Sequence, residues 1–144
     1  GYEELDVTRI GIYKSALELI KENPFFGIGA GSFTEIFFLN TNFWKGHSHN
    51  LLLELSISYG LPATIIFFMT TLNILYLSSK KIFSRKIEIG PNYIDRAFWS
   101  ALFFFLISQL ADVQYFDGKI SLITWILIAA LKNIILDNHY RTLA

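Results

Sequence analysis

The sequence predicts an all-α, polytopic membrane protein fragment in which periplasmic amphipathic helices precede three transmembrane helices. Of its 144 residues, 53% are hydrophobic and 14 are phenylalanine, above the ~45–50% apolar share of soluble domains. Basic and acidic residues balance at 12 each, and so apolar a chain without net charge would aggregate in water. A bilayer is therefore the expected solvent. The lack of a basic excess argues against nucleic acid binding, and the lack of cysteine excludes disulfides and thiolate metal sites.

Residues 1–49 contain no spanning segment, and we expect them to form a periplasmic region of amphipathic helices. The spacing predicts a first helix over residues 7–22, with Asp6 as its N-cap, which ends before Pro24 because the residue preceding proline avoids the helical region. Its apolar face would carry Tyr13, Ala16, Leu17 and Ile20. Arg9 falls on the same face, where it would either extend to water or hold an anion.

A glycine-rich segment with Gly27, Gly29 and Gly31 follows Pro24. A helix precedes these glycines, whereas a dinucleotide-binding loop needs a strand before them and a helix after them. We therefore exclude nucleotide binding and expect a tight turn with close backbone approach.

The next predicted helix covers residues 32–39. Ser32 would cap it, with Glu35 three residues on. Its apolar residues suit the membrane interface, namely Phe33, Ile36, Phe37 and Phe38. Trp44 would be an interfacial aromatic anchor.

Residues 50–144 are expected to hold three membrane spans, over 50–79, 94–111 and 120–136. The first is long and apolar enough to cross the hydrocarbon core, and Pro62 predicts a kink or a helix restart near Gly60. The loop 80–93 is short and basic, which is typical of the cytoplasmic side; Lys132, His139 and Arg141 would end on that side too. This orientation places His49 and the N-terminal region in the periplasm, with residues 112–119 as a second periplasmic loop.

Polar groups gather where the chain enters the first span, in His47, His49 and Asn50. They could form a chemical site facing the interface, or a polar helix cap that contains histidine. His47 and His49 could form a metal pair, but no third ligand has suitable spacing. We therefore expect no metal and interpret His47 as a supporting loop residue. Asn50 could either orient His49 or cap the helix.

Two carboxylates are further candidates. An intramembrane carboxylate is a functional candidate by default, and Glu54 could pair with an arginine or reach the interface. Asp112, at the mouth of the second periplasmic loop, could face the same cavity as the histidines or be a solvated loop acid.

The order of these residues resembles the O-antigen ligase and polymerase family. The family signature is a histidine, then Asn, Ser or Gln, nine residues, a glycine, two residues, and Gly, Thr or Tyr. Here His49-Asn50 is followed by nine residues, Gly60, two residues and Ala63. Only Ala63 departs, at a position that concerns helix packing. The family's arginine-led helix, proline and Gly-x-Gly turn are matched in order by Arg9, Pro24, Gly27 and Gly29.

The resemblance implies an inverting, metal-independent glycosyltransferase of the bacterial inner membrane, without a cofactor. It would move a polyprenyl-diphosphate-linked glycan onto an acceptor sugar hydroxyl on the periplasmic face. The family roles assign the base to His49 and the diphosphate contact to Arg9. Neutral imidazole can accept a hydroxyl proton, and guanidinium suits phosphate. The chain would be a C-terminal fragment, about the last third of a typical member and inactive alone.

Other functions fit the same sequence features. Ligation to a lipid A core, polymerisation of repeat units and glycosylation of a pilin share the motif. A transporter or non-enzymatic membrane protein on the same scaffold would be expected to show an inverted repeat or paired broken helices, and the break near Gly60 gives half of that pattern. A purely structural subunit leaves Arg9 and the histidines unexplained.

Overall fold

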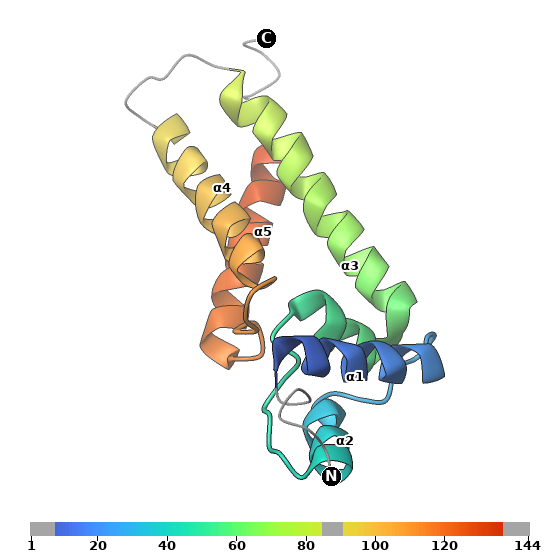
Figure 1. Cartoon of the computed structure of the whole chain (residues 1–144). Coiled ribbons are helices and arrows are strands. Elements are labelled where there is room, and N and C mark those ends of the chain that lie inside the picture. Colours follow the sequence, from blue (N-terminus) through green and yellow to red (C-terminus); the bar gives the residue numbers. More distant parts are fainter. Residues whose placement is uncertain (1–7, 85–90, 137–144) are drawn as a thin grey trace. The chain divides into compact units, whose positions relative to one another are not determined.

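The computed structural model describes residues 8–84 and 91–136, and the regular structure in these ranges is entirely α-helical. The all-α prediction is therefore confirmed for the described residues. In chain order the helices are α1 (Arg9–Glu22), α2 (Ser32–Thr41), α3 (Leu51–Phe83), α4 (Pro91–Ser108) and α5 (Gly118–Leu136), as Figure 1 shows. The predicted cytoplasmic residues His139 and Arg141 lie outside the described residues, as does part of the loop 80–93.

By packing, the chain divides into two compact units. Among the described residues, unit 1 comprises residues 8–67 and Gln109–Gln114, and unit 2 comprises residues 68–84, 91–108 and 115–136. The predicted division at residue 49 concerns the membrane rather than packing, and it stays a prediction. All the candidate site residues belong to unit 1.

Helix α1 begins two residues later than an N-cap at Asp6 would set it. Thr8 is the N-cap, and its hydroxyl accepts a hydrogen bond from the N–H of Gly11 at 3.3 Å; Asp6 itself lies outside the described residues. The helix ends at Glu22 with Asn23 as C-cap, directly before Pro24, as predicted.

The buried face of α1 is formed by Ile12, Ala16 and Ile20. These residues pack against Phe33 and Phe37 of α2 in the core of unit 1. The prediction was wrong for Leu17, which is half-exposed, because the buried stripe is centred on Ile12 and Ala16 instead.

Helix α2 is two residues longer than predicted, and its N-terminus is built differently. Gly31, in a left-handed conformation, is the N-cap and makes no side-chain cap. Ser32 is the first helical residue, and its hydroxyl donates to the carbonyl of Ile28 at 2.9 Å. The predicted serine cap is therefore wrong. Burial of Phe33 and Phe37 inside unit 1 also means that only part of this apolar face is available to a membrane interface.

Helix α3 breaks at Gly60, where φ is 83° and ψ is 166°, as the nearby proline predicts. The break separates a short segment (residues 51–59) from a long segment (residues 61–83). Pro62 fits just after the break, because the first turn of a helix does not need its N–H.

A glycine turn (residues 24–29) lies against this break. Three backbone hydrogen bonds join them, from Ile28 N to Ile57 O, from Gly29 N to Ser58 O and from Leu61 N to Pro24 O, at 2.8, 3.1 and 2.8 Å. The break leaves the carbonyls and the amide without their usual helical partners, and the turn supplies them.

Two glycines permit the close approach. Gly27 has φ +67°, and a Cβ there would lie 2.7 Å from the backbone of Ser58 and Tyr59. Gly60 has φ +83°, and a Cβ there would collide with the backbone of Phe25 and Phe26. This is the kind of backbone contact that a glycine-rich turn predicts.

Two helices in the described ranges are long and apolar enough to cross a membrane, α3 and α5. The third predicted span is not found: α4 is a helix, but it does not meet this test. Asp95 and Arg96 lie near its start, so its uncharged part, residues 97–108, is about 18 Å long at 1.5 Å per residue. The uncharged part alone is shorter than the ~30 Å hydrocarbon core, so a crossing by α4 would also have to include its charged first turns.

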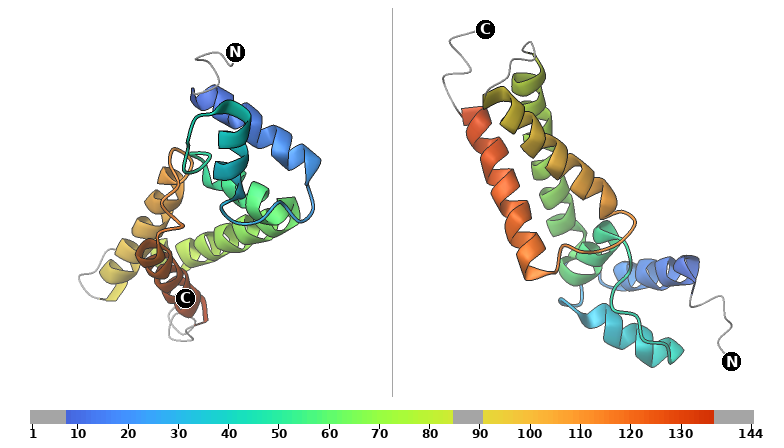
Figure 2. Two further views of the ribbon diagram at one scale, coloured as in Figure 1. Left: turned by 90° about the horizontal axis from the view of Figure 1, so that it is seen from below. Right: turned by 90° about the vertical axis from the view of Figure 1, so that its left-hand side faces the viewer.

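Unit 2 contains α4, α5 and most of the long segment of α3. Helices α4 and α5 pack side by side (Figures 1 and 2). Leu75, Leu102 and Leu131 are at the centre of its core, and the indole N–H of Trp99 donates to the carbonyl of Leu75 at 2.9 Å.

Candidate functional site

The two histidines lie in the turn that leads into α3 (residues 47–50), which we call the histidine turn. A buried carboxylate, that of Glu54, is hydrogen-bonded to the backbone of this turn. Glu54 is 4% exposed, and its Oε2 accepts a hydrogen bond from the backbone N–H of Ser48 at 2.8 Å. Ser48 is fully buried, and its hydroxyl donates to the carbonyl of Asn50 at 3.2 Å. Glu54 therefore shapes the histidine turn, a role that neither of its predicted alternatives described.

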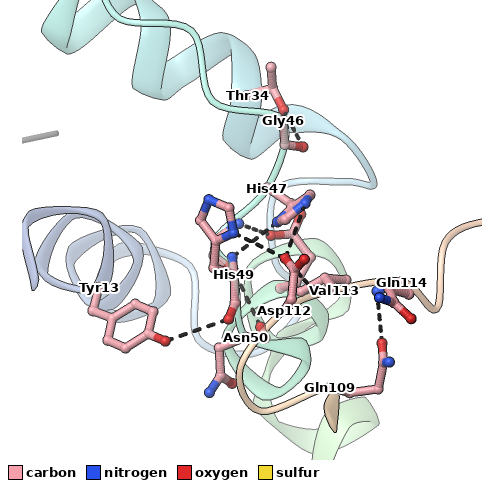
Figure 3. Close-up of polar contacts among 12 residues, drawn as sticks. Tyr13, Thr34, Gly46, His47, His49, Asn50, Gln109, Asp112, Val113 and Gln114 are labelled. Atoms are coloured by element: carbon pink, nitrogen blue, oxygen red, sulfur yellow. Dashed lines mark hydrogen bonds and ion pairs between the residues drawn. The ribbon is translucent and has the colours of Figure 1, made fainter. Parts of the chain in front are cut away.

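His49 has an unusual backbone conformation, with φ +56°. This left-handed region costs a non-glycine residue about 1–2 kcal/mol, and such strain persists where surrounding contacts enforce it. The N–H of His49 donates to Nδ1 of His47 at 3.2 Å, and the hydroxyl of Tyr13 donates to the carbonyl of His49 at 3.5 Å (Figure 3). The two imidazole rings meet edge to face, with centroids 4.4 Å apart.

Asp112 lies beside both imidazoles. Its Oδ1 is 3.1 Å from Nδ1 of His49 and 3.6 Å from Nε2 of His47 (Figure 3). The Asp112 side chain is 51% exposed, while the histidines are partly buried. The loop between α4 and α5 thus brings a carboxylate to the histidine turn across 63 residues of sequence.

Asn50 performs two functions at this point. Its Oδ1 accepts from the N–H groups of Leu52 and Leu53 at 3.0 and 3.2 Å, which is the N-cap arrangement. Its Nδ2 donates to the carbonyl of Leu110 at 3.0 Å. Leu51 N also donates to Gln109 O at 2.9 Å. Asn50 therefore caps α3 and fastens the loop that carries Asp112.

These contacts assign the imidazole protons. Because His49 Nδ1 faces a carboxylate, it carries the proton, so neutral His49 presents an unprotonated Nε2. Because His47 Nδ1 accepts from a backbone N–H, its proton is on Nε2, directed at Asp112. His49 thus has the arrangement of a base oriented by an acid through its other nitrogen.

A metal ion fits this group less well. One ligand atom each from His47, His49 and Asp112 lies within 4.8 Å of the others, so Asp112 is the third ligand whose spacing the sequence could not show. A metal on Nε2 of His47, however, needs the proton on Nδ1, where the N–H of His49 already donates. The hydrogen bonds therefore favour a proton-sharing group over a metal centre.

The electrostatics of Asp112 agree with this assignment. The hydrogen bond from His49 is the main influence that lowers the pKa of Asp112 below its ordinary value; partial burial opposes it, and the N–H of Val113 and the charge of His47 assist. The carboxylate is accordingly ionised at neutral pH, and its charge can stabilise an imidazolium on either histidine.

Arg9 lies apart from the histidine turn in the contacts just described. It is the exposed first residue of α1, one helical turn before Tyr13, which does reach His49. The motif residues Pro24, Gly27, Gly29 and Gly60 meet one another at the break in α3 instead of at the histidines.

Tyr13 and the backbone of Gln109 and Leu110 were not identified from sequence as site residues. Tyr13 was assigned only to an apolar face, and nothing in its spacing shows that its hydroxyl reaches a histidine carbonyl. The carbonyls of Gln109 and Leu110 leave no signal in a sequence at all.

A protein-family model described as O-antigen ligase matches residues 3–68, a range that contains α1, α2, the histidine turn and the break in α3. Neither a curated protein nor a solved structure matches the chain.

Proposed function

Since residues 3–68 match a family model described as O-antigen ligase, we propose that this chain is part of a membrane glycosyltransferase. It would move a polyprenyl-diphosphate-linked glycan onto an acceptor sugar hydroxyl at the periplasmic face of the bacterial inner membrane. His49 is the proposed base, Asp112 orients it, and Arg9 binds the diphosphate. The contact between His49 Nδ1 and Asp112 carries this proposal, because it leaves Nε2 of His49 free to accept a proton.

In the proposed step, the acceptor hydroxyl gives its proton to Nε2 of His49 while its oxygen forms a bond to the anomeric carbon of the donor glycan. The bond between that carbon and the diphosphate oxygen breaks, and polyprenyl diphosphate leaves with one more negative charge. One displacement of this kind inverts the anomeric centre. The imidazolium that forms is stabilised by the Asp112 carboxylate, and the proton later passes to solvent or to the leaving group.

The charge on the departing diphosphate needs a cation, and Arg9 is the proposed one. Residues four apart on a helix have Cβ atoms about 5–6 Å apart, so Arg9 neighbours Tyr13, whose hydroxyl reaches the backbone of His49. Arg9 is exposed and its planar guanidinium can contact two phosphate oxygens together.

His47 and Asn50 support the base. His47 Nδ1 accepts the backbone N–H of His49, and Asn50 fastens the Asp112 loop. The basic loop 80–93 supports placing the histidine turn in the periplasm, where the lipid-linked donor and its acceptor would meet.

The experiment replaces His49, Arg9 and Asp112 singly in the full protein expressed in its own host, with surface glycan resolved on a gel. Each variant must first be shown to reach the membrane. For His49→Ala we expect loss of polymeric surface glycan and accumulation of the lipid-linked precursor. A loss of about 10²–10⁴-fold is typical when a general base is removed. Arg9→Ala and Asp112→Asn should reduce transfer in the same direction.

Matched controls exist for two of these variants. Asp117→Asn makes the same chemical change in the same interhelical loop, where Asp117 accepts from the N–H of Lys119 at 2.9 Å and Asn caps a helix equally well. Lys14→Ala removes an exposed cation from α1. Unchanged glycan in both His49→Ala and Arg9→Ala would refute the transferase assignment and favour a transporter on the same scaffold.

A further inference from the structure

Two consecutive phenylalanines at the glycine turn are exposed. Phe25 is 69% exposed and Phe26 is 90% exposed. Single exposed apolar residues are ordinary, but adjoining ones point to an interaction surface. We call this pair the aromatic tip.

The aromatic tip lies at the start of the membrane-spanning part of α3. Leu61, the first residue of the long segment, donates its N–H to the carbonyl of Pro24, directly before the tip. The apolar surface continues onto that segment, where Leu61 is 38% exposed and Ile65, one turn further, is 53% exposed. The tip therefore extends the apolar surface of the span.

The backbone on both sides of the tip is hydrogen-bonded within the protein. Inside hydrocarbon, backbone polar groups need protein partners. Pro24 has no N–H, its carbonyl accepts from Leu61, and the N–H groups of Gly27 and Ile28 donate to Asn23 and Ile57. These backbone groups beside the tip therefore already have protein partners where the turn meets the long segment of α3.

From these observations we infer that the aromatic tip inserts into the bilayer, at the level where the long segment of α3 enters the hydrocarbon. Aromatic and aliphatic side chains at this boundary are buried between headgroups and acyl chains. The lipid bilayer, on the side where the long segment begins, is thus the partner of this surface.

Insertion has a consequence for the histidine turn that rests on the proposed function. The short segment of α3 joins the break at Gly60 to the histidine turn, and its nine residues span about 13 Å. With the tip anchored, His49 can lie at most about that far above the hydrocarbon boundary. A diphosphate on a lipid carrier is held in this zone, so the tip sets the height of the base relative to its substrate.

The test measures depth directly in the full protein reconstituted into nanodiscs of phosphatidylethanolamine and phosphatidylglycerol. This chain has no cysteine, so Phe26→Cys gives one labelling site in it for an environment-sensitive nitrobenzoxadiazole fluorophore, once any cysteine elsewhere in the protein is replaced by serine. Ile66→Cys on the exposed face of the long segment is the lipid reference, and Lys21→Cys on α1 is the water reference.

The expected result is blue-shifted emission at position 26 that brominated acyl chains quench, as at position 66. Quenching by aqueous iodide, as at position 21, would overturn the inference. Shielding from both quenchers would also overturn it, since a protein contact would then cover the tip.

An assay of glycan transfer tests the consequence for the height of His49 separately from insertion itself. The double variant Phe25→Ser, Phe26→Ser should lower glycan transfer, whereas Leu39→Ser, an equally exposed leucine on α2, should not. If the tip is inserted and the double variant transfers normally, the tip does not set the height of His49. A wild-type protein without transfer activity would refute the proposed function, while the quenching result would still decide insertion.

Discussion

Substitution of Gly27 by alanine tests whether the glycine turn and the break in α3 form one structural unit. Gly27 and Gly31 both have left-handed backbones, with φ of +67° and +79°. They differ in surroundings, because a Cβ on Gly31 meets nothing within 4 Å, whereas a Cβ on Gly27 meets the backbone of Ser58 and Tyr59 at 2.7 Å. Gly31→Ala is therefore a control for the backbone conformation alone.

The magnitudes follow from this difference. An alanine in the left-handed region costs about 1–2 kcal/mol at either position. At Gly27 the turn must also move away from α3, which breaks the hydrogen bonds from Ile28 N to Ile57 O and from Gly29 N to Ser58 O. At about 0.5–1.5 kcal/mol for each bond, Gly27→Ala should be less stable than Gly31→Ala by about 1–3 kcal/mol.

The assay is denaturant titration of the purified protein in detergent, with the free energy of unfolding extrapolated for the wild type and both variants. Equal losses of stability in the two variants would refute the reasoning, because the close backbone approach would then contribute nothing. A larger loss in Gly31→Ala would contradict it outright.

Three further predictions concern the site. Asn50→Asp keeps the oxygen that caps α3 but loses the donor to Leu110, so glycan transfer should fall at nearly unchanged stability. Asn50→Ala should lose about 0.5–2 kcal/mol of unfolding free energy as well. Glu54→Gln should retain an acceptor for the buried N–H of Ser48, whereas Glu54→Ala should cost about 1–3 kcal/mol, measured by the same titration. The lowered pKa of Asp112 contributes stability above pH about 3.9, the unfolded value, that is lost as pH falls through the lower folded value. The stability advantage of the wild type over Asp112→Asn should shrink in that acid range, and a constant difference would contradict the assigned contact.

Local features of the fold were readable from sequence because they depend on neighbouring residues. The end of α1 before Pro24 and the break near Gly60 follow from the backbone restrictions of proline and glycine. The N-caps of the helices were harder to predict from the sequence. Asp6 and Thr8 are both residues that can cap a helix, and Ser32 can bond either forward as a cap or back to Ile28, so the sequence alone does not select the cap.

The prediction of a third membrane span failed because α4 has too few consecutive uncharged residues. A stretch of phenylalanine and leucine in α4 raises local hydropathy, but Asp95 and Arg96 are on the helix that it would need in order to reach across the core. Counting apolar residues without the charged first turns overestimates the spanning length.

Only part of the site could be predicted from the sequence, because its residues come from two segments that are far apart along the chain. His47, His49 and Asn50 are adjacent, so their pattern can be recognised. Asp112 is one of several loop acids until the chain folds, and its contact with His49 depends on two hydrogen bonds to loop carbonyls, one from the backbone N–H of Leu51 and one from the side-chain amide of Asn50. Such bonds involve carbonyls that every residue has, and a sequence cannot distinguish them.

The fixed interval between the histidine and the glycine of the motif has a physical explanation in this arrangement. The nine residues between Asn50 and Gly60 form a helical strut, capped by Asn50 at one end and bound by the glycine turn at the other. Each added or removed residue would change the strut by about 1.5 Å and rotate one end against the other by about 100°. The capping amide would then no longer face Leu110, and the carboxylate of Asp112 would lose its alignment with Nδ1 of His49. The interval thus fixes the orientation of His49 relative to the glycine turn, which explains why residues far from the histidines form part of the same motif.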